Sequence, residues 1–202
     1  MFVVGITGGI GSGKSQVSGI FREKGALLLD ADEISRKVTD IDGSALPKVR
    51  ELLGGKFFDA DGVLDRKKVA ATVFSDRKLL DAYAKVIHDE VLSEIQKTLE
   101  IERQKGTKLV VLDVPIPVKK GFIDACNHVL VVSCEDELRR ERLILRGMDE
   151  EDVRRRMAMQ MSKEEYEELS DFVIENNEDI PKLQEKVNDY IVNELTKRGI
   201  RL

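Results

Sequence analysis

The sequence predicts an α/β fold in which a five-stranded parallel sheet is flanked by helices. Short runs of consecutive apolar residues, typical of strands that are buried on both faces, recur along the chain. They are residues 2–6, 26–30, 109–113, 129–132 and 172–174. Stretches with helical spacing of apolar residues separate these runs. The first strand, the first helix and the second strand follow one another closely enough to form a βαβ unit.

A glycine-rich stretch, residues 8–15, follows the first strand and opens the first helix, residues 14–24. Its spacing, Gly, four residues, Gly-Lys-Ser, is that of the phosphate-binding P-loop, rather than of a simple turn. Backbone N–H groups wrap the phosphates in such a loop, so glycines keep side chains out of the way. Lys14 can reach the β- and γ-phosphates, and Ser15 can bind Mg²⁺. We therefore predict a P-loop NTPase fold that binds the phosphates of a nucleotide together with Mg²⁺. The residues predicted to bind the nucleotide here are Gly9, Gly11, Ser12, Gly13, Lys14, Ser15 and Gln16.

The segment between the second and third strands reads as almost wholly helical. The expected helices are Leu46–Leu53, a helix capped by Asp65 that runs to Phe74, and a long helix that is capped by Ser75 or Asp76 and ended by Gly106. Such a long excursion between two core strands forms the acceptor-binding part of small kinases. By this analogy, we predict that residues 33–107 are a helical, acceptor-binding insertion.

The C-terminal part contains a helix over residues 135–146 and a last helix over residues 181–197. The last helix carries one apolar stripe that we expect to face the core. Its members are Leu183, Val187, Ile191 and Leu195.

Composition limits the function classes. The chain has 202 residues, of which 42% are hydrophobic, and this suits a single domain over residues 1–202. No apolar run approaches the roughly 18 residues of a membrane-spanning helix. The net charge of −5 argues against a general nucleic-acid binder. Cys126 and Cys134 lack metal-like spacing, and thiols of this kind suit a reducing compartment. We predict a cytoplasmic protein without nucleic-acid or membrane partners.

Carboxylates stand at the ends of two predicted strands. Asp113 follows four apolar residues, which is the pattern of a Walker-B aspartate that holds Mg²⁺ opposite Ser15. Asp30 and Asp32 stand two apart, so in an extended segment they point the same way, and one can accept the proton of an attacking hydroxyl. The alternative is a turn in which Asp32 caps the next helix. Arg36, one helical turn further, can bind an acceptor phosphate or pair with Asp32.

Seven arginines fall between residues 139 and 156. The guanidinium group suits the negative charge that spreads over a transferring phosphoryl group, so we predict an arginine-rich lid over residues 139–170. We predict that Arg142, Arg146 and Arg156 are the arginines that contact the transferring phosphoryl group. Acidic residues are interleaved with the arginines, so a solvated helix face is the alternative for most of them.

Together, these residues resemble the dephospho-CoA kinase family over nearly the whole chain. The resemblance rests on residues 6–15, residues 30–32 with Ser35 and Arg36, residues 87–88, residues 112–115, Arg156 with Gln160, and residues 171–176. It implies a fold like that of nucleoside-monophosphate kinases, with an ATP core, a helical CoA-binding insertion and a lid. The implied reaction moves the γ-phosphate of ATP to the ribose 3′-hydroxyl of dephospho-CoA, the last step of coenzyme A synthesis.

The resemblance also implies roles for single residues. Asp32 would be the base or would orient the hydroxyl, and Arg36, His88 and Pro115 would help to form the acceptor site. Asn176 would lie near the adenine of ATP. The predicted catalytic residues are Lys14, Asp32, Arg142 and Arg146.

The chain departs from the family pattern in three places. Asp89 stands where the family has proline after its histidine. Lys119 stands where the family has glutamate, and Pro117 alters the backbone before it. The lid reads Arg146-Gly147 without the family's aspartate between them. The residues that favour a working enzyme are intact, namely Lys14, Ser15, Asp32 and Asp113.

Two alternative functions stay open. One is another small-molecule or nucleotide kinase, against which the aspartate pair of residues 30–32 and the segment 171–176 argue. The other is a GTP-dependent switch. A switch normally carries Asn-Lys-x-Asp for guanine, and residues 176–179 read Asn-Asn-Glu-Asp without the lysine.

Overall fold

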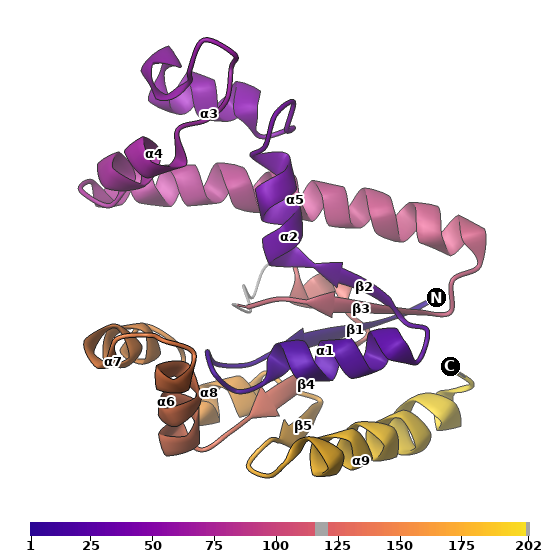
Figure 1. Cartoon of the computed structure of the whole chain (residues 1–202). Helices are drawn as coiled ribbons and strands as arrows, with labels where there is room; N and C mark the ends of the chain where they lie inside the picture. Colours follow the sequence, from indigo (N-terminus) through magenta and orange to yellow (C-terminus); the bar gives the residue numbers. More distant parts are fainter. Residues whose placement is uncertain (116–120, 201–202) are drawn as a thin grey trace. The chain divides into compact units, whose positions relative to one another are not determined.

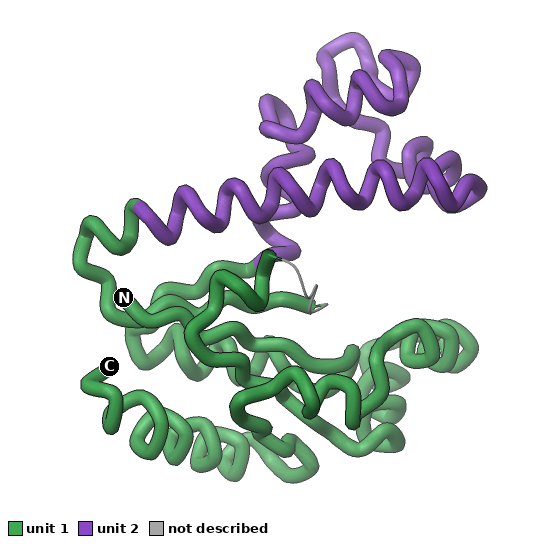
Figure 2. Tube along the Cα trace, turned by 180° about the vertical axis from the view of Figure 1, so that it is seen from behind, with its two compact units in different colours: residues 1–30, 101–202 green, residues 31–100 purple. Residues whose placement is uncertain are grey.

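The computed structural model describes residues 1–115 and 121–200. It divides into two compact units, which Figure 2 colours separately. We call residues 1–30 and 101–202 the core unit, and residues 31–100 the helical unit. Pro117 and Lys119, two of the departures from the family pattern, lie outside the described residues. No helix of the described residues is long and apolar enough to span a bilayer.

The core unit is built on a five-stranded sheet with strand order β2-β3-β1-β4-β5 (Figure 1). The strands are β1 Phe2–Thr7, β2 Leu27–Asp30, β3 Leu109–Asp113, β4 His128–Ser133 and β5 Phe172–Glu175. All four neighbouring pairs are parallel. Every residue of β3 and β4 is buried, which explains why these strands read as continuous apolar runs. The predicted fold class is therefore confirmed.

Two helices, α1 (Lys14–Glu23) and α9 (Ile180–Tyr190), pack against each other and contribute to the main hydrophobic cluster. Alternate residues of β1, such as Val4 and Ile6, enter the same cluster, as the two-residue period of a strand requires. The stripe predicted for the last helix is confirmed, since all four of its members lie in this cluster. The helix continues past α9 through a π-helical turn, Ile191–Leu195, and a 3₁₀ turn, Thr196–Arg198.

The remaining elements of the core unit lie between β3 and β5 in the sequence. They are a 3₁₀ turn, Ile123–Ala125, and the helices α6 Asp136–Leu145, α7 Glu150–Ala158 and α8 Lys163–Glu168. The segments that follow β1, β3, β4 and β5 leave the sheet at its carboxyl edge, where open α/β sheets bind their ligands. This edge positions the residues of the candidate site.

The helical unit contains the excursion between β2 and β3. Its elements are α2 Ala31–Val38, α3 Leu46–Leu53, a 3₁₀ turn Gly55–Phe57, α4 Arg66–Val73, and most of α5 Arg77–Lys105. Asp65 caps α4 by accepting from Lys68 N at 3.0 Å, as predicted. Asp76, rather than Ser75, caps α5 by accepting from Lys78 N at 2.9 Å.

The prediction that Asp30 and Asp32 lie in an extended segment is wrong. Asp30 is the last residue of β2, and α2 begins directly at Ala31, so Asp32 lies in the first helical turn. The alternative, a helix cap at Asp32, is wrong for the same reason. Carboxylates in a first turn are stabilised by the positive end of the helix dipole, and this favours a helix that starts without an intervening turn.

One polar pair lies in the core of the sheet. His128 Nδ1 and the Tyr190 hydroxyl are 2.8 Å apart, and both side chains are buried. The rings of Phe21 and Phe172 pack on Tyr190 with centroids at 6.0 and 5.0 Å. Burial raises the pKa of Tyr190, so its hydroxyl stays protonated and available to the histidine. Each of the two groups is therefore satisfied by the other.

We expect Tyr190→Phe to lower the free energy of unfolding by about 1–3 kcal/mol, because it leaves a buried ring nitrogen without its partner. The double variant His128→Leu, Tyr190→Phe should recover part of this loss, because it removes both polar groups. Urea denaturation of the single and double variants measures this. A single variant that matches the unaltered protein would show that the pair contributes nothing to stability.

Candidate active site

The P-loop, residues 8–15, joins β1 to α1. Gly13 caps α1 with φ of 94°, which is the left-handed region. A Cβ at this position would also collide with the side-chain amide of Asn176, so both the backbone and the packing require glycine. Lys14 and Ser15 begin α1, and their N–H groups have no acceptor within the helix. Backbone donors at such a helix start attract anions.

Asp113 lies at the carboxyl end of β3, beside the P-loop. Its carboxylate is 3% exposed; one oxygen forms an ion pair with Lys14 Nζ, and the other accepts from Ser18 Oγ at 2.6 Å. The pairing of β1 with β3 places these groups together. Motif spacing and a strand end identify Lys14 and Asp113 in the sequence, but not Ser18. The signal was a small polar residue one helical turn after Lys14, between the buried residues Val17 and Phe21.

The donor set suits Mg²⁺ rather than a metal held by protein ligands alone. The described residues contain no group of three or more His, Cys, Asp or Glu side chains that could hold a metal ion. The hydroxyl of Ser15 is exposed at the start of α1, and Asp113 supplies a carboxylate nearby in the site. Mg²⁺ usually takes one or two protein oxygens and completes its shell with waters and substrate phosphates.

Two asparagines follow β5, and one of them contacts the P-loop. Asn176 is 3% exposed, and its Nδ2 donates to Ser12 O at 2.7 Å. Its backbone N–H donates to Ser133 O at 2.8 Å. Asn177 Oδ1 accepts from Glu135 N at 2.9 Å, at the start of α6. The loop after β5 is thus held against both the P-loop and the turn that leads into α6.

A cavity of about 580 Å³ opens beside Asn176. It brings together four predicted site residues from three segments. They are Gln16, Arg142, Arg146 and Asn176. Leu145 and Ile180, which are 86% and 55% exposed, line it with Pro181. Exposed apolar side chains next to guanidinium groups suit a flat ring with polar edges.

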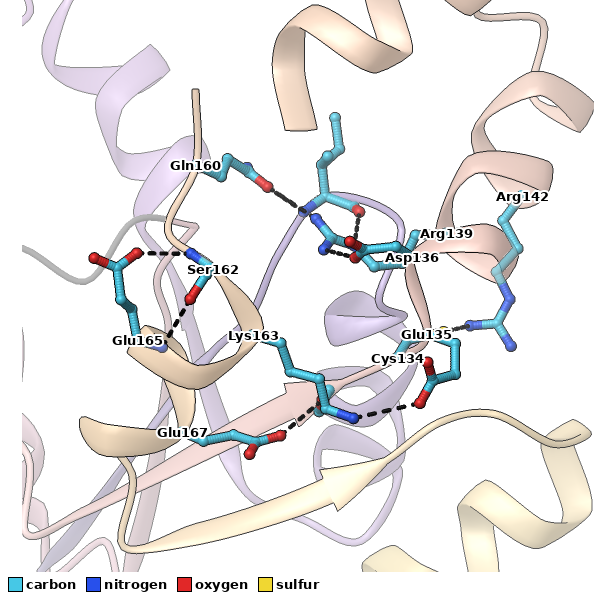
Figure 3. Close-up of polar contacts among 12 residues, drawn as sticks. Cys134, Glu135, Asp136, Arg139, Arg142, Gln160, Ser162, Lys163, Glu165 and Glu167 are labelled. Atoms are coloured by element: carbon cyan, nitrogen blue, oxygen red, sulfur yellow. Dashed lines mark hydrogen bonds and ion pairs between the residues drawn. The ribbon is translucent and has the colours of Figure 1, made fainter. Parts of the chain in front are cut away.

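Arg142 also contacts a cysteine. Its Nη1 donates to Cys134 Sγ at 3.3 Å, as Figure 3 shows. Burial raises the pKa of the Cys134 thiol. The cysteine therefore stays a neutral thiol that helps to orient the guanidinium. Both cysteines of the chain are free, and neither is a metal ligand among the described residues.

The other arginines of the cluster divide into surface pairs and one buried group. Arg140 pairs with Glu137 and Glu150, and Arg155 pairs with Asp152, as the solvated-face alternative expected. Arg156 is exposed and does not line the cavity that holds Arg142 and Arg146.

Arg139 is 7% exposed and donates from Nε to Ile10 O at 2.9 Å (Figure 3). Gln160 Oε1 accepts from Ile10 N at 2.8 Å. Arg139 and Gln160 are not among the predicted site residues, because nothing in their spacing indicates contact with the P-loop.

The predicted acceptor residues belong mostly to the helical unit. Asp32 and Arg36 are exposed one helical turn apart on α2, and the Arg36 carbonyl accepts from Arg66 Nη2 at 3.0 Å. His88 is half-buried on α5, with Nδ1 at 3.8 Å from a carboxylate oxygen of Asp89. Pro115 follows β3 in the core unit. Their joint role in an acceptor site stays a prediction.

The two asparagines provide a matched pair of variants. Asn176→Asp replaces a donor with an acceptor against the Ser12 carbonyl, so we expect a loss of about 1–3 kcal/mol in the free energy of unfolding. Asn177→Asp adds the same charge but keeps the oxygen that accepts from Glu135 N, so we expect a change within about 0.5 kcal/mol. Chemical denaturation measures both. Equal losses would mean that added charge, rather than the lost donor, governs the result.

A family model described as dephospho-CoA kinase matches residues 2–182. The dephospho-CoA kinase of Corynebacterium diphtheriae is 37% identical over 178 residues, which cover 88% of this chain and 89% of the relative. The structure is similar to TT1252 from Thermus thermophilus, with a TM-score of 0.77, 30% identity and coverage of 96% and 97% of the two chains. It also resembles the fold of the dephospho-CoA kinase from Campylobacter jejuni, with a TM-score of 0.73, 21% identity and 98% of each chain covered.

These matches agree with the geometry of the site, in which a P-loop lysine lies beside a buried strand-end aspartate and two arginines line a cavity. The family model spans nearly the whole chain. The relative from Corynebacterium diphtheriae has the same name, and the match covers most of its length. The chain belongs to the dephospho-CoA kinase family, the enzymes that use ATP to phosphorylate dephospho-CoA in coenzyme A biosynthesis.

Proposed function

We propose that this protein transfers the γ-phosphate of Mg²⁺-bound ATP to the ribose 3′-hydroxyl of dephospho-CoA, giving CoA and ADP. The observation that carries the proposal is the contact of Lys14 with the buried Asp113 at the end of β3. It supports the proposal because a lysine side chain suits phosphate and a carboxylate suits Mg²⁺, and the two lie in contact at the carboxyl edge. We also propose that the enzyme works in the cytoplasm, without nucleic-acid or membrane partners.

The donor phosphates bind at residues 8–15 in this proposal. The N–H groups at the start of α1 face the anion, and Lys14 neutralises charge on the β- and γ-phosphates. Ser15 and Asp113 would hold Mg²⁺, directly or through water. Bound Mg²⁺ supplies charge neutralisation across the β- and γ-phosphates. Ser18 keeps the Asp113 carboxylate in one orientation, since its hydroxyl donates to one of the two oxygens.

The adenine of ATP occupies the cavity of about 580 Å³ between α6 and the loop before α9 in this proposal. Arg142 and Leu145 offer one wall, and Ile180 with Pro181 the other. Arg146 lies one turn after Arg142 and is exposed, so it is free to approach the phosphates when the lid closes. Both arginines would stabilise the charge of the transferring phosphoryl group.

The acceptor binds to the helical unit in this proposal. Asp32 takes the proton of the 3′-hydroxyl or orients it, since its carboxylate is exposed in the first turn of α2. Arg36, on the same face one turn later, binds acceptor phosphate. His88 of the helical unit and, separately, Pro115 of the core unit are the further residues proposed to bind the acceptor.

Turnover with a panel of acceptors tests the proposal. The purified protein is incubated with Mg²⁺-ATP and, separately, dephospho-CoA, AMP, CMP, shikimate or no acceptor, and ADP is measured. We expect ADP with dephospho-CoA alone. Turnover with AMP but not with dephospho-CoA would show that the proposed acceptor is wrong. A parallel sample with GTP tests for a switch, since hydrolysis without any acceptor would favour that class.

Asp32→Asn tests the proposed base. We expect ATP affinity to be unchanged and turnover to fall by roughly 100-fold or more, as on loss of acid–base assistance. Glu33→Gln is the control, because it removes the same charge from the same helical turn and should leave turnover within about 3-fold. Steady-state kinetics and calorimetric ATP binding measure the two effects. Near-normal turnover of the Asp32 variant would remove this residue from the mechanism.

A further inference from the structure

Both backbone polar groups of one P-loop residue are held by side chains from outside the loop. Ile10 N donates to Gln160 Oε1 at 2.8 Å, and Ile10 O accepts from Arg139 Nε at 2.9 Å (Figure 3). The two side chains also contact each other, since Arg139 Nη2 donates to Gln160 Oε1 at 3.3 Å. Arg139 comes from α6, and Gln160 follows α7.

The guanidinium of Arg139 is held firmly at this position. The side chain is 8% exposed, and each of its three nitrogens donates a hydrogen bond; Nη1 donates to Asp136 Oδ1 at 2.8 Å. A buried cation is costly unless it is paired and hydrogen-bonded, so leaving this arrangement would be unfavourable. Arg139 is therefore a rigid donor to the loop.

The loop sequence makes space for this arginine. The P-loop spacing requires Gly8 and Gly13 but leaves the four residues between them open. Gly9 and Gly11 are two of those four. A Cβ on Gly9 would collide with the Arg139 guanidinium, and a Cβ on Gly11 would press on the Arg139 backbone and on Leu143. The packing of α6 thus explains Gly9, and at Gly11 it adds to a backbone φ of 81° that by itself favours glycine.

The contacts fix the two peptide planes on either side of Ile10. In a trans peptide the C=O and the following N–H point in opposite directions. When Arg139 holds Ile10 O, the N–H of Gly11 must point away from Arg139. When Gln160 holds Ile10 N, the carbonyl of Gly9 points the other way, and it accepts from Ser12 N at 3.1 Å. Glycine peptides turn over easily, so these planes need external support.

We propose that Arg139 and Gln160 are positioning residues for phosphoryl transfer, which orient the peptides around Ile10 so that the Gly11 N–H faces the phosphates of the donor nucleotide. The inference rests on the proposed function of the P-loop as the donor site. It predicts an effect on phosphate binding but not on base binding. The cavity beside Arg142 and Asn176 does not include Arg139 or Gln160.

Two variants of Gln160 form a matched pair. Gln160→Met keeps the length of the side chain but removes the oxygen that accepts from Ile10 N and Arg139. Gln160→Glu keeps an accepting oxygen for both donors. We expect Gln160→Met to weaken ADP binding about 10-fold, the effect of losing the hydrogen bond that holds the Ile10 N–H, and to leave adenosine binding unchanged. Gln160→Glu should bind both ligands within about 2-fold of the unaltered protein.

Isothermal calorimetry with ADP and with adenosine gives the affinities of each variant. Steady-state kinetics then checks that Gln160→Met raises KM for ATP and leaves KM for dephospho-CoA constant. Circular dichroism confirms that each variant is folded at the temperature used. Arg139→Lys, which retains a cation but not the fork of three nitrogens, serves as a second variant if Gln160→Met does not fold, and it should show the same split between ADP and adenosine.

Equal losses for ADP and adenosine, or no loss for either, would overturn the inference. Equal behaviour of the Met and Glu variants of Gln160 would overturn it as well, because the accepting oxygen would then have no role. These binding measurements contain no acceptor. Failure of the unaltered protein to phosphorylate dephospho-CoA, with ADP binding intact, would contradict the proposed function and leave this inference standing.

Discussion

The buried carboxylate of Asp113 is the constraint on which the site depends. A carboxylate that is 3% exposed is tolerated only when its oxygens are paired, and Lys14 and Ser18 pair one oxygen each. Both partners lie on α1, one helical turn apart. The pairing therefore holds the start of α1, and with it the P-loop, beside the end of β3. Loss of either partner would leave a charged oxygen buried without compensation.

Four of the five carbonyl groups from Gly9 to Gly13 accept hydrogen bonds from protein donors. Gly9 O accepts from Ser12 N, Ile10 O from Arg139, Ser12 O from Asn176, and Gly13 O from the first turn of α1. Carbonyl oxygens repel phosphate, so turning them toward protein donors clears the loop for an anion, which the N–H groups at the start of α1 attract. The side-chain donors come from α6 and from the loop after β5. The anion site is thus a product of three segments that are far apart in the sequence.

The sequence was sufficient for the sheet, because parallel strands buried on both faces appear as continuous apolar runs that need no other context. It was also sufficient for Lys14 and Asp113, since a fixed spacing and a strand end identify them. It was insufficient for Asp30 and Asp32, where a helix begins directly after β2 and the expected extended segment does not occur. Arg139 and Gln160 were missed, because their contacts with Ile10 span 129 and 150 residues.

The sequence by itself determined the fold class, the P-loop, the strand-end aspartate and the apolar stripe of the last helix. Each of these follows from local spacing, which the period of a helix or strand converts directly into geometry. The tertiary structure alone decided which arginine is buried against the loop and whether Asn176 and Asn177 donate or accept their hydrogen bonds. It also decided why Gly9 has no room for a side chain. Those properties depend on contacts between distant segments, and local spacing carries no information about a neighbour that only folding brings near.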